Sequence, residues 1–533
     1  MENRDEFSET AYHPIVLHII PRILTNLDRD PTSPTYGCFD RNYWHYKIQD
    51  YSSGLLQQSM LTLALVYSNY FSGNIYYKKD EIREFAIAGI EYCIGIQHND
   101  GSFDEYWAGE HSIPSTAFTL YAICETSDIL GYTTEGVKHC IDKSVHFLEN
   151  NVERGALNQE MVSIAAIRCA AAILKDDRIT DLATSRFAQF IEKQTNEGWF
   201  PEYGGFDVSY STVTLDYLIR FYVLSKEEKA LESAKRLLNI LKYFVHPDGS
   251  VGGEYGTRNT EYFLPYGAEY LRKGSIIADK FVSKVLGYIS RKDYLNLSWD
   301  ERYILHYVSH SFVKALLIHK KYRYSHNDVL PCETIFNHFF RDAQIYIHSN
   351  QNYYFIANLS KGGIFKAVCK KTMEASTDCT FRINYKGNQY VAEWPKNNEY
   401  SLENDRFTVK TTFAKTNVMQ QSTLKLLLLR LSSKVLRAKA RTLTKNTLLF
   451  GKRDVEDMTL CRTISLKDEK IIIEDTIDVG AREVTARLIP SLSVRYIPSS
   501  RFYQVNTINT KIKSEKIKFK GKISLKRELT FGQ

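Results

Sequence analysis

The side chains best suited to chemistry are concentrated in one stretch of the sequence, residues 97–112. It reads Gln-His-Asn-Asp-Gly-Ser-Phe-Asp-Glu-Tyr-Trp-Ala-Gly-Glu-His-Ser, so carboxylates, two histidines and aromatic rings share a short segment punctuated by glycine. The apolar segments on either side, residues 87–96 and 116–123, are predicted to be helical. A polar and aromatic loop held between two helices is a typical place for catalysis or recognition.

Three residues in such loops could transfer protons or stabilise charge. His111 follows Glu110, and a neighbouring carboxylate raises the pKa of a histidine toward neutrality, as general acid/base work requires. Tyr210 follows a Gly-Gly-Phe-Asp turn and could protonate a leaving oxygen or, once ionised, remove a proton from carbon. Asn158 opens a helix beside Gln159 and could neutralise a bound carboxylate. The structural alternatives are a backbone-bonded histidine, a packed tyrosine and a helix N-cap.

A second set of residues is suited to holding a sugar. Trp44, His45 and Lys47 form an aromatic and basic cluster that could stack on a sugar ring and pair with its carboxylate. Arg258 offers a bidentate fork for a carboxylate. The same loops supply further candidates for substrate binding: Glu105, Trp107, Glu110, Asp207, Asn259 and Glu261. Hydrogen bonds that hold each loop together are the alternative role for these side chains.

The sequence lacks the motifs of metal, nucleotide, serine-nucleophile and nucleic-acid chemistry. His306 and His310 could chelate a metal from one helix face, but no third ligand accompanies them, so a structural role is favoured and no metal is predicted. No phosphate-binding loop, dinucleotide fingerprint or serine-nucleophile elbow occurs, so no cofactor is predicted. No basic stripe interleaved with aromatic residues is present, which makes binding to nucleic acid unexpected.

The polar loops recur about every fifty residues, each between predicted helices. They lie near residues 36–47, 97–112, 150–160, 194–210 and 246–262. A period of this size indicates one helical hairpin per unit. Loops that leave from the same end of their hairpins converge on one face, so we predict an (α/α) toroid over residues 1–330 with a common central cleft.

Beyond residue 330 the apolar pattern changes to a period of two, which indicates short strands. Their spacing suits an antiparallel β-sandwich over residues 331–533. The expected chain is therefore α+β, with a helical domain followed by a β domain. One segment of the second domain, residues 423–441, is instead predicted to be helical, with leucines on one face and basic residues on the rest. It is either an interfacial helix on an anionic membrane or an amphipathic helix docked on the sandwich.

Composition is ordinary for a soluble globular protein. The 533 residues are 44% hydrophobic and 25% charged, which is ordinary, and the net charge of +7 permits an acidic substrate or a membrane surface. Nine scattered cysteines without a CxxC motif, and an N-terminus without a secretory signal, indicate reduced thiols and a cytoplasmic location. No run of about 18 apolar residues occurs, so no membrane-spanning helix is expected.

The loops and one late hairpin resemble those of the heparinase II/III-like polysaccharide lyases. The resemblance rests on residues 100–105, Asn158 with Gln159, residues 205–210 and the hairpin over 461–475. More narrowly, residues 44–47, 110–112 and 258–262 are similar to bacterial heparinase-like proteins associated with surface-polysaccharide synthesis. The family pairs an (α/α) toroid with a C-terminal antiparallel β-sandwich, and its substrates are acidic polysaccharides.

The resemblance also implies roles for individual residues. In such lyases an Asn or Gln neutralises the uronate carboxylate, a Tyr or His removes the C5 proton, and a Tyr protonates the glycosidic oxygen. Carried over, these roles fall to Asn158, His111 and Tyr210. The family's Asn is often followed by His, whereas Gln159 follows here. A cytoplasmic lyase would meet polymer inside the cell or a lipid-linked glycan at the inner membrane face, where residues 423–441 would touch the membrane.

Three functions remain open. The first is β-elimination on a uronate-containing glycan, or the related C5-epimerisation, because both begin with the same proton abstraction. The second is a non-catalytic glycan-binding or assembly protein, which the missing Asn-His pair favours. The third is a terpene-cyclase-like toroid, which ranks last because no aspartate-rich motif is present.

Overall fold

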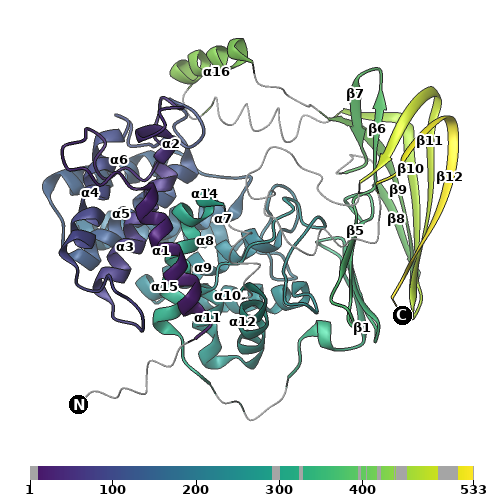
Figure 1. Ribbon diagram of the computed structural model, residues 1–533, viewed down its shortest axis with the longest axis horizontal. Helices are drawn as coiled ribbons and strands as arrows, with labels where there is room; N and C mark the ends of the chain where they lie inside the picture. The colour runs from purple at the N-terminus through teal and green to yellow at the C-terminus, as the bar shows by residue number, and fades with distance from the viewer. Residues whose placement is uncertain are drawn as a thin grey trace.

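Helices form the first part of the chain and antiparallel strands the second, as Figure 1 shows for the computed structural model. The structure describes residues 10–290, 300–322, 324, 328–393, 398–403, 405–416, 422–436, 439, 453–489 and 514–531. The prediction of an α+β chain with its helices first is confirmed. The last helix of the first part ends at Ile318 and the first strand begins at Phe336. The domain limits of 1–330 and 331–533 remain predictions.

The helices of the first part alternate between two kinds. They are α1 (Tyr12–Asn26), α2 (Arg41–Trp44), α3 (Ser59–Ser68), α4 (Asp80–Ile96), α5 (Ile113–Leu130), α6 (Glu135–Asn150), α7 (Leu157–Leu174), α8 (Asp177–Ile191), α9 (Val208–Ser225), α10 (Glu228–Leu241), α11 (Tyr266–Leu271), α12 (Ile276–Ile289), α14 (Glu301–Tyr303) and α15 (Ser309–Ile318). Helix α5 buries 14 of its 18 residues, whereas α8 buries 5 of 15 along one stripe. A helix that is buried all round lies inside its domain, and one with a single apolar stripe lies at the surface.

The inner helices form a closed ring. Helices α3, α5, α7, α9, α11 and α15 each pack against the next, and α15 returns to α3. A hydroxyl pair, Thr62 and Ser309, joins α3 to α15 at 2.8 Å. Tyr12 on α1 donates to Glu269 at 2.7 Å and so joins the first helix of the chain to α11 of the ring. Helix α7 is apolar and long enough to cross a membrane, but 72% of it is buried inside this ring, as befits a core helix.

Short helical turns complete the first part and lead into the sheets. The 3-10 turns are η2 (Gly54–Gln58), η3 (Lys242–Phe244), η4 (Arg272–Gly274) and η6 (Pro331–Glu333), and η5 (Ile304–Val308) is a π-helical turn. Turn η2 packs against α5 and against η5. It therefore links the start of the ring to its end.

Two antiparallel sheets make up the second part. The first has the order β1-β2-β3-β4-β5, with strands Phe336–Phe340, Ile345–Ser349, Tyr353–Asn358, Ile364–Cys369 and Ala375–Asp378. The second has the order β10-β11-β6-β7-β9-β8, with β12 paired to β11. Its strands are β6 (Phe381–Tyr385), β7 (Asn388–Val391), β8 (Asn398–Glu403), β9 (Arg406–Thr416), β10 (Arg453–Leu466), β11 (Lys470–Leu488) and β12 (Lys516–Thr530).

The first sheet lies between the helices and the second sheet. Every residue of β3 is buried, because alternate side chains face opposite layers. Tyr354 and Ile356 belong to the core of the helical domain. Tyr353 and Phe355 belong to the core shared with the second sheet, where the Phe355 ring lies 6.2 Å from that of Phe407 on β9. The first sheet therefore separates two hydrophobic cores and contributes side chains to both.

Helix α16 (Thr423–Leu436) confirms the helix predicted inside the β domain, but not its docking on the sheets. Arg430 pairs with Asp50 at 2.5 and 2.8 Å, and Ser433 accepts a hydrogen bond from Trp107 at 2.8 Å. Both partners belong to loops of the helical domain, and Figure 1 shows α16 above α2. The interpretation that the helix docks on the sandwich is wrong, because its polar anchors lie on the other domain. Residues 437, 438, 440 and 441 lie outside the described residues.

A buried ion-pair network ties the two sheets together. Arg462 on β10 is fully buried and donates to Asp475 at 2.7 Å and to Asp378, on β5, at 3.0 Å. Arg527 on β12 also pairs with both carboxylates. Each charge therefore has a partner, which is the condition for keeping ions out of water.

Replacing Arg462 with alanine is expected to lower the free energy of unfolding by about 3–5 kcal/mol, because it leaves buried carboxylates undercompensated. Urea unfolding followed by circular dichroism measures the change. The matched control is Lys470→Ala, which removes an exposed pair with Glu528 at 3.2 Å and should cost less than about 1 kcal/mol. Equal midpoints for the two variants would contradict a structural role for the network.

Candidate active site

Loops from distant parts of the sequence meet in one cavity of the helical domain. With its open mouth it measures about 480 Å³. It is lined by Leu55, Glu105, Tyr106, Pro114, Phe118, Asn158, Gln159, Tyr210, Arg302, Tyr303, His306 and Tyr307. The four tyrosines and the convergent polar groups are typical of a small-molecule or sugar site. Of the predicted site residues, the structure brings together Glu105, Asn158 and Tyr210.

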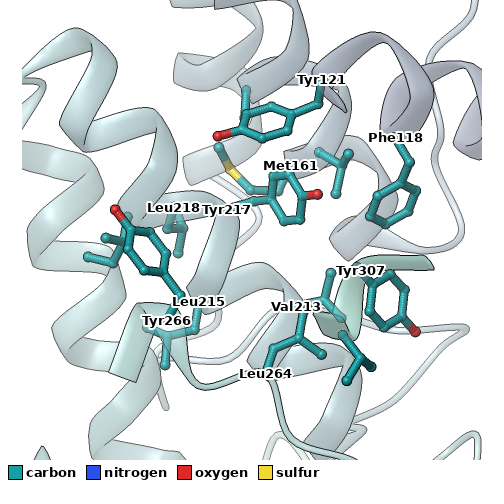
Figure 2. Packing of buried hydrophobic residues seen from close by; sticks show 14 of the residues in the cluster. Phe118, Tyr121, Met161, Val213, Leu215, Tyr217, Leu218, Leu264, Tyr266 and Tyr307 are labelled. Carbon is teal, nitrogen blue, oxygen red and sulfur yellow. The ribbon is translucent and has the colours of Figure 1, made fainter. Parts of the chain in front are cut away.

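The floor of the cavity is part of the aromatic core. The Phe118 ring lies 5.4 Å from that of Tyr307, and Figure 2 shows both beside Tyr217 and Met161 in the packed interior. The Tyr307 hydroxyl donates to the Tyr262 hydroxyl at 2.7 Å. The walls are therefore held by packing against the inner helices, which suits a preformed site.

Tyr210 is held at the start of α9 by a buried carboxylate. Asp207 caps the helix by accepting the backbone N–H of Tyr210 at 3.3 Å. It also accepts the backbone N–H of Arg258 at 2.8 Å and the hydroxyl of Thr260. Burial raises the pKa of Asp207, and these hydrogen bonds partly offset the rise. Asp207 therefore does not line the cavity but positions Tyr210, which does.

Asn158 is oriented by a residue that sequence reasoning did not select. Its amide donates to Glu202 Oε2 at 2.6 Å, and its backbone N–H donates to Oε1 of the same carboxylate at 2.6 Å. Glu202 is fully buried. The N-cap of α7 is Ala156, so Asn158 does not serve as the helix cap. The next residue, Gln159, has a buried amide oxygen that has no partner among the described residues.

Arg302 supplies the cationic group of the cavity. Its guanidinium donates to Glu105 at 3.0 Å and lies 4.8 Å from the centre of the Tyr106 ring. The loop that carries Glu105 is fixed by Glu110, whose buried carboxylate accepts the backbone N–H groups of Glu105 and Tyr106 at 2.9 and 2.6 Å. Glu110 therefore shapes the loop and does not line the cavity. Arg302 was not among the predicted site residues.

His306 also lines the cavity, and its imidazole could accept a proton. It sits in η5, where its ψ of −132° interrupts the helical backbone. Burial, reinforced by the charge of Arg302, holds the pKa of His306 well below its ordinary value of 6.5, so the ring is neutral at pH 7. Its Nδ1 is buried with no hydrogen-bond partner in the described part of the chain. A π-helical turn with an unsatisfied buried nitrogen is typical of a functional position.

The structural role favoured for the histidine pair holds for His310 alone. Arg220 lies 3.1 Å from its Nδ1, and Gln58 lies 3.4 Å from its Nε2. Among the described residues, no three His, Cys, Asp or Glu side chains are grouped to hold a metal.

His111 lies outside the cavity, in the loop that contains Glu105. Its Nδ1 is 2.7 Å from Asp100 and 2.7 Å from Ser102, and its ring stacks on His98 at 4.3 Å. His98 in turn lies 2.9 Å from Asp104. These contacts hold the loop together through side chains. His111 is therefore structural, but its partners are Asp100 and Ser102 and not the backbone carbonyl that was the expected alternative. The candidate base in the cavity is accordingly His306.

The predicted sugar-binding cluster at residues 44–47 is also apart from the cavity. The Trp44 indole donates to the backbone oxygen of Asn26 at 2.8 Å. His45 and Lys47 are exposed on the surface that follows α2. Trp107 donates to Ser433 of α16, as described above. None of these four side chains lines the cavity.

The remaining candidates lie behind Tyr210 or at the junction with the sheets. The Arg258 guanidinium stacks 4.2 Å above the ring of Tyr203, which is 6.1 Å from that of Tyr210. Asn259 accepts a hydrogen bond from Lys361 at 2.5 Å. Glu261 pairs with Lys366 at 3.3 Å, and burial raises its pKa to about 7. The last two contacts join the fifth polar loop to the first sheet.

The same architecture occurs in solved polysaccharide lyases. A Paenibacillus xanthan lyase matches with a TM-score of 0.53 and 9% identity, over 99% of this chain and 58% of that one. The chondroitin AC lyase of Streptomyces coelicolor, solved with chondroitin sulphate, matches with a TM-score of 0.55 and 10% identity, over 90% of this chain and 68% of that one. This chain thus spans little more than half the length of the xanthan lyase. No protein-family model and no curated protein sequence matches it. The chain has the fold of the polysaccharide lyases.

The His98–Asp104 pair predicts a pH-dependent stability. Burial alone would lower the pKa of His98, but the hydrogen bond and charge of Asp104 outweigh it and raise the pKa above 6.5. The pair stabilises the folded state fully when the pH is below the pKa that His98 has in the unfolded chain. This stabilisation is lost as the pH rises through the pKa that His98 has in the folded protein.

His98→Gln is therefore expected to reduce the free energy of unfolding more at about pH 5.5 than at about pH 9, measured by urea titration at both values. The control is His146→Gln, because His146 is 75% exposed and its 3.8 Å pair with Glu149 should add little at either pH. A loss for His98→Gln that is equal at both pH values would show that Asp104 does not stabilise the protonated imidazole of His98.

Proposed function

We propose that this protein is a carbohydrate-active lyase that cleaves an acidic polysaccharide by β-elimination beside a uronate residue, on a scaffold of a helical toroid and a β-sandwich. One observation carries the proposal: Asn158, Tyr210 and His306, from three separate elements, meet in one tyrosine-rich cavity. They supply an amide, a phenol and a neutral imidazole, the groups that such an elimination needs. The fold shared with xanthan and chondroitin AC lyases supports the same class.

The carboxylate of the substrate would lie between Arg302 and the start of α7. Glu105 takes one donor of the Arg302 guanidinium, and a guanidinium has five. Asn158 and Gln159 add amide groups to the lining of the same cavity, and the hydrogen bond to Glu202 keeps Asn158 in place. Neutralising the carboxylate stabilises the negative charge that develops when the adjacent C5 proton leaves.

The elimination then needs one proton acceptor and one proton donor. His306, which is uncharged, accepts the C5 proton on a ring nitrogen. The C5–H electron pair forms the C4–C5 double bond while the bond from C4 to the glycosidic oxygen breaks. The hydroxyl of Tyr210 donates its proton to that leaving oxygen. The products are an unsaturated uronate end and a new hydroxyl end, and transfer of the proton from His306 to the tyrosinate through solvent restores the site.

The reaction can be followed directly. Purified protein is incubated with a panel of acidic glycans, and ultraviolet absorbance reports the unsaturated uronate. Tyr210→Phe and His306→Ala are each expected to lower kcat by about 10²–10⁴-fold, because each removes a proton-transfer group. His111→Asn is the matched control, since it keeps a side chain that tolerates the positive φ of 53° and lies outside the cavity. It should retain most of the wild-type rate.

Other outcomes would redirect the proposal. A rate lost in His111→Asn but kept in His306→Ala would return the role of base to His111. Deuterium uptake at C5 without any absorbance change would indicate an epimerase. Glycan binding without product or exchange would indicate the non-catalytic alternative.

The pH profile of the reaction tests the base separately. A base must be unprotonated in the free enzyme, and the pKa of His306 lies well below 6.5. The acid limb of kcat/KM, which reports free-enzyme groups, is therefore expected below pH 6.5, with no loss of rate between that limb and neutrality. An acid limb at or above pH 6.5 in wild type would exclude His306 as the base.

A further inference from the structure

We propose that the outward face of α16 docks on an anionic membrane surface. Its leucine side is turned away from the protein. Five apolar side chains spaced as one helical face are 53–81% exposed: Leu424, Leu427, Leu428, Leu431 and Val435. A helix in a globular protein normally turns such a stripe inward, so a stripe turned outward marks a surface for another apolar phase.

The opposite side of the helix fixes this orientation. Ser433 is buried and bonded to Trp107, and Arg430 forms a two-bond ion pair with Asp50. Residues 430 and 433 lie three apart and so share a face of the helix. Because that polar face is anchored to the helical domain, the leucine face points outward.

The charges of α16 match an anionic surface. The helix contains three basic residues and no acidic residue. Lys425 and Lys434 are exposed, and at 100° per residue they fall on the two flanks of the leucine stripe. This is the arrangement of an interfacial helix, whose apolar face enters the acyl boundary while lysines at its sides reach the headgroups.

A neighbouring loop extends the surface. The segment after α2 reaches α16 through Asp50, and it exposes Tyr46 by 55% and Ile48 by 75%. Lys47 lies between them and is also exposed. Aromatic, aliphatic and basic side chains are thus also exposed on the loop that anchors α16, and the proposal assigns Tyr46, Lys47 and Ile48 to the same membrane contact.

An anionic bilayer fits this surface better than the other occupants. A sulphated or uronate glycan would satisfy the lysines but leave the leucines in contact with polar groups. A second copy of the chain would cover the leucines but bring two helices without any acidic residue face to face, and like charges repel. A membrane with acidic headgroups complements both the leucines and the lysines.

Flotation of the full chain with vesicles tests the proposal without reference to lyase activity. The protein is expected to float with vesicles of phosphatidylcholine and phosphatidylglycerol at low salt, and to stay at the bottom with phosphatidylcholine alone. Lys425→Gln and Lys434→Gln should each lower the partition coefficient about fivefold. Leu427→Asp combined with Leu431→Asp should lower it by more than about tenfold. High salt should weaken the binding of wild type.

The control is Ile335→Asp, which places one such charged side chain at a 67% exposed apolar residue next to β1. Strand β1 lies far from α16 in Figure 1. This control variant should float as wild type does, and circular dichroism confirms that every variant is folded. Wild type that stays at the bottom with anionic vesicles overturns the proposal, as does equal flotation of the double leucine variant. Sedimentation that shows a lipid-independent dimer, lost in that variant, would assign the face to a second copy instead.

Discussion

The loops of the helical domain depend on one interaction, a buried carboxylate that accepts N–H groups. Asp207, Glu110 and Glu202 are fully buried, and each accepts at least two N–H donors from a neighbouring loop or helix start. A charged group can leave water only where such donors compensate it, so each carboxylate fixes the geometry around it. From these fixed points Tyr210 and Asn158 reach the cavity.

This constraint explains which side chains could be predicted and which could not. The recurring loops, the helical first half and the roles open to Asn158 and Tyr210 follow from local sequence, because glycines, polar clusters and apolar periods are local signals. Glu110 and Asp207 were predicted to bind sugar for the same reason. The sequence around a loop carboxylate does not show whether it binds a substrate or a backbone N–H. Only the tertiary structure separates the two, through burial that depends on distant segments.

His306 and α16 show two further limits of sequence reasoning. His306 lies in an apolar segment, and its place in the cavity depends on a π-helical turn, which has no local sequence signature. In α16 the periodicity correctly predicts a helix with a leucine stripe, but periodicity does not say which side meets the protein. The orientation of α16 is set by its contacts with Asp50 and Trp107, which lie more than three hundred positions earlier in the chain.

The β domain also helps to position the candidate site. Lys361, fully buried after β3, donates to the backbone oxygens of Glu254 and Gly256 at 2.6 and 2.9 Å and to the side chain of Asn259 at 2.5 Å. A buried ammonium needs several hydrogen-bond acceptors. Because all three acceptors belong to residues 254–259, these bonds hold that loop in one conformation. In the same loop, the backbone N–H of Arg258 donates to Asp207, and Asp207 caps the helix that carries Tyr210. A continuous set of hydrogen bonds therefore connects the first sheet to Tyr210 in the cavity. In this way the β domain helps to hold a site whose lining comes from the helical domain.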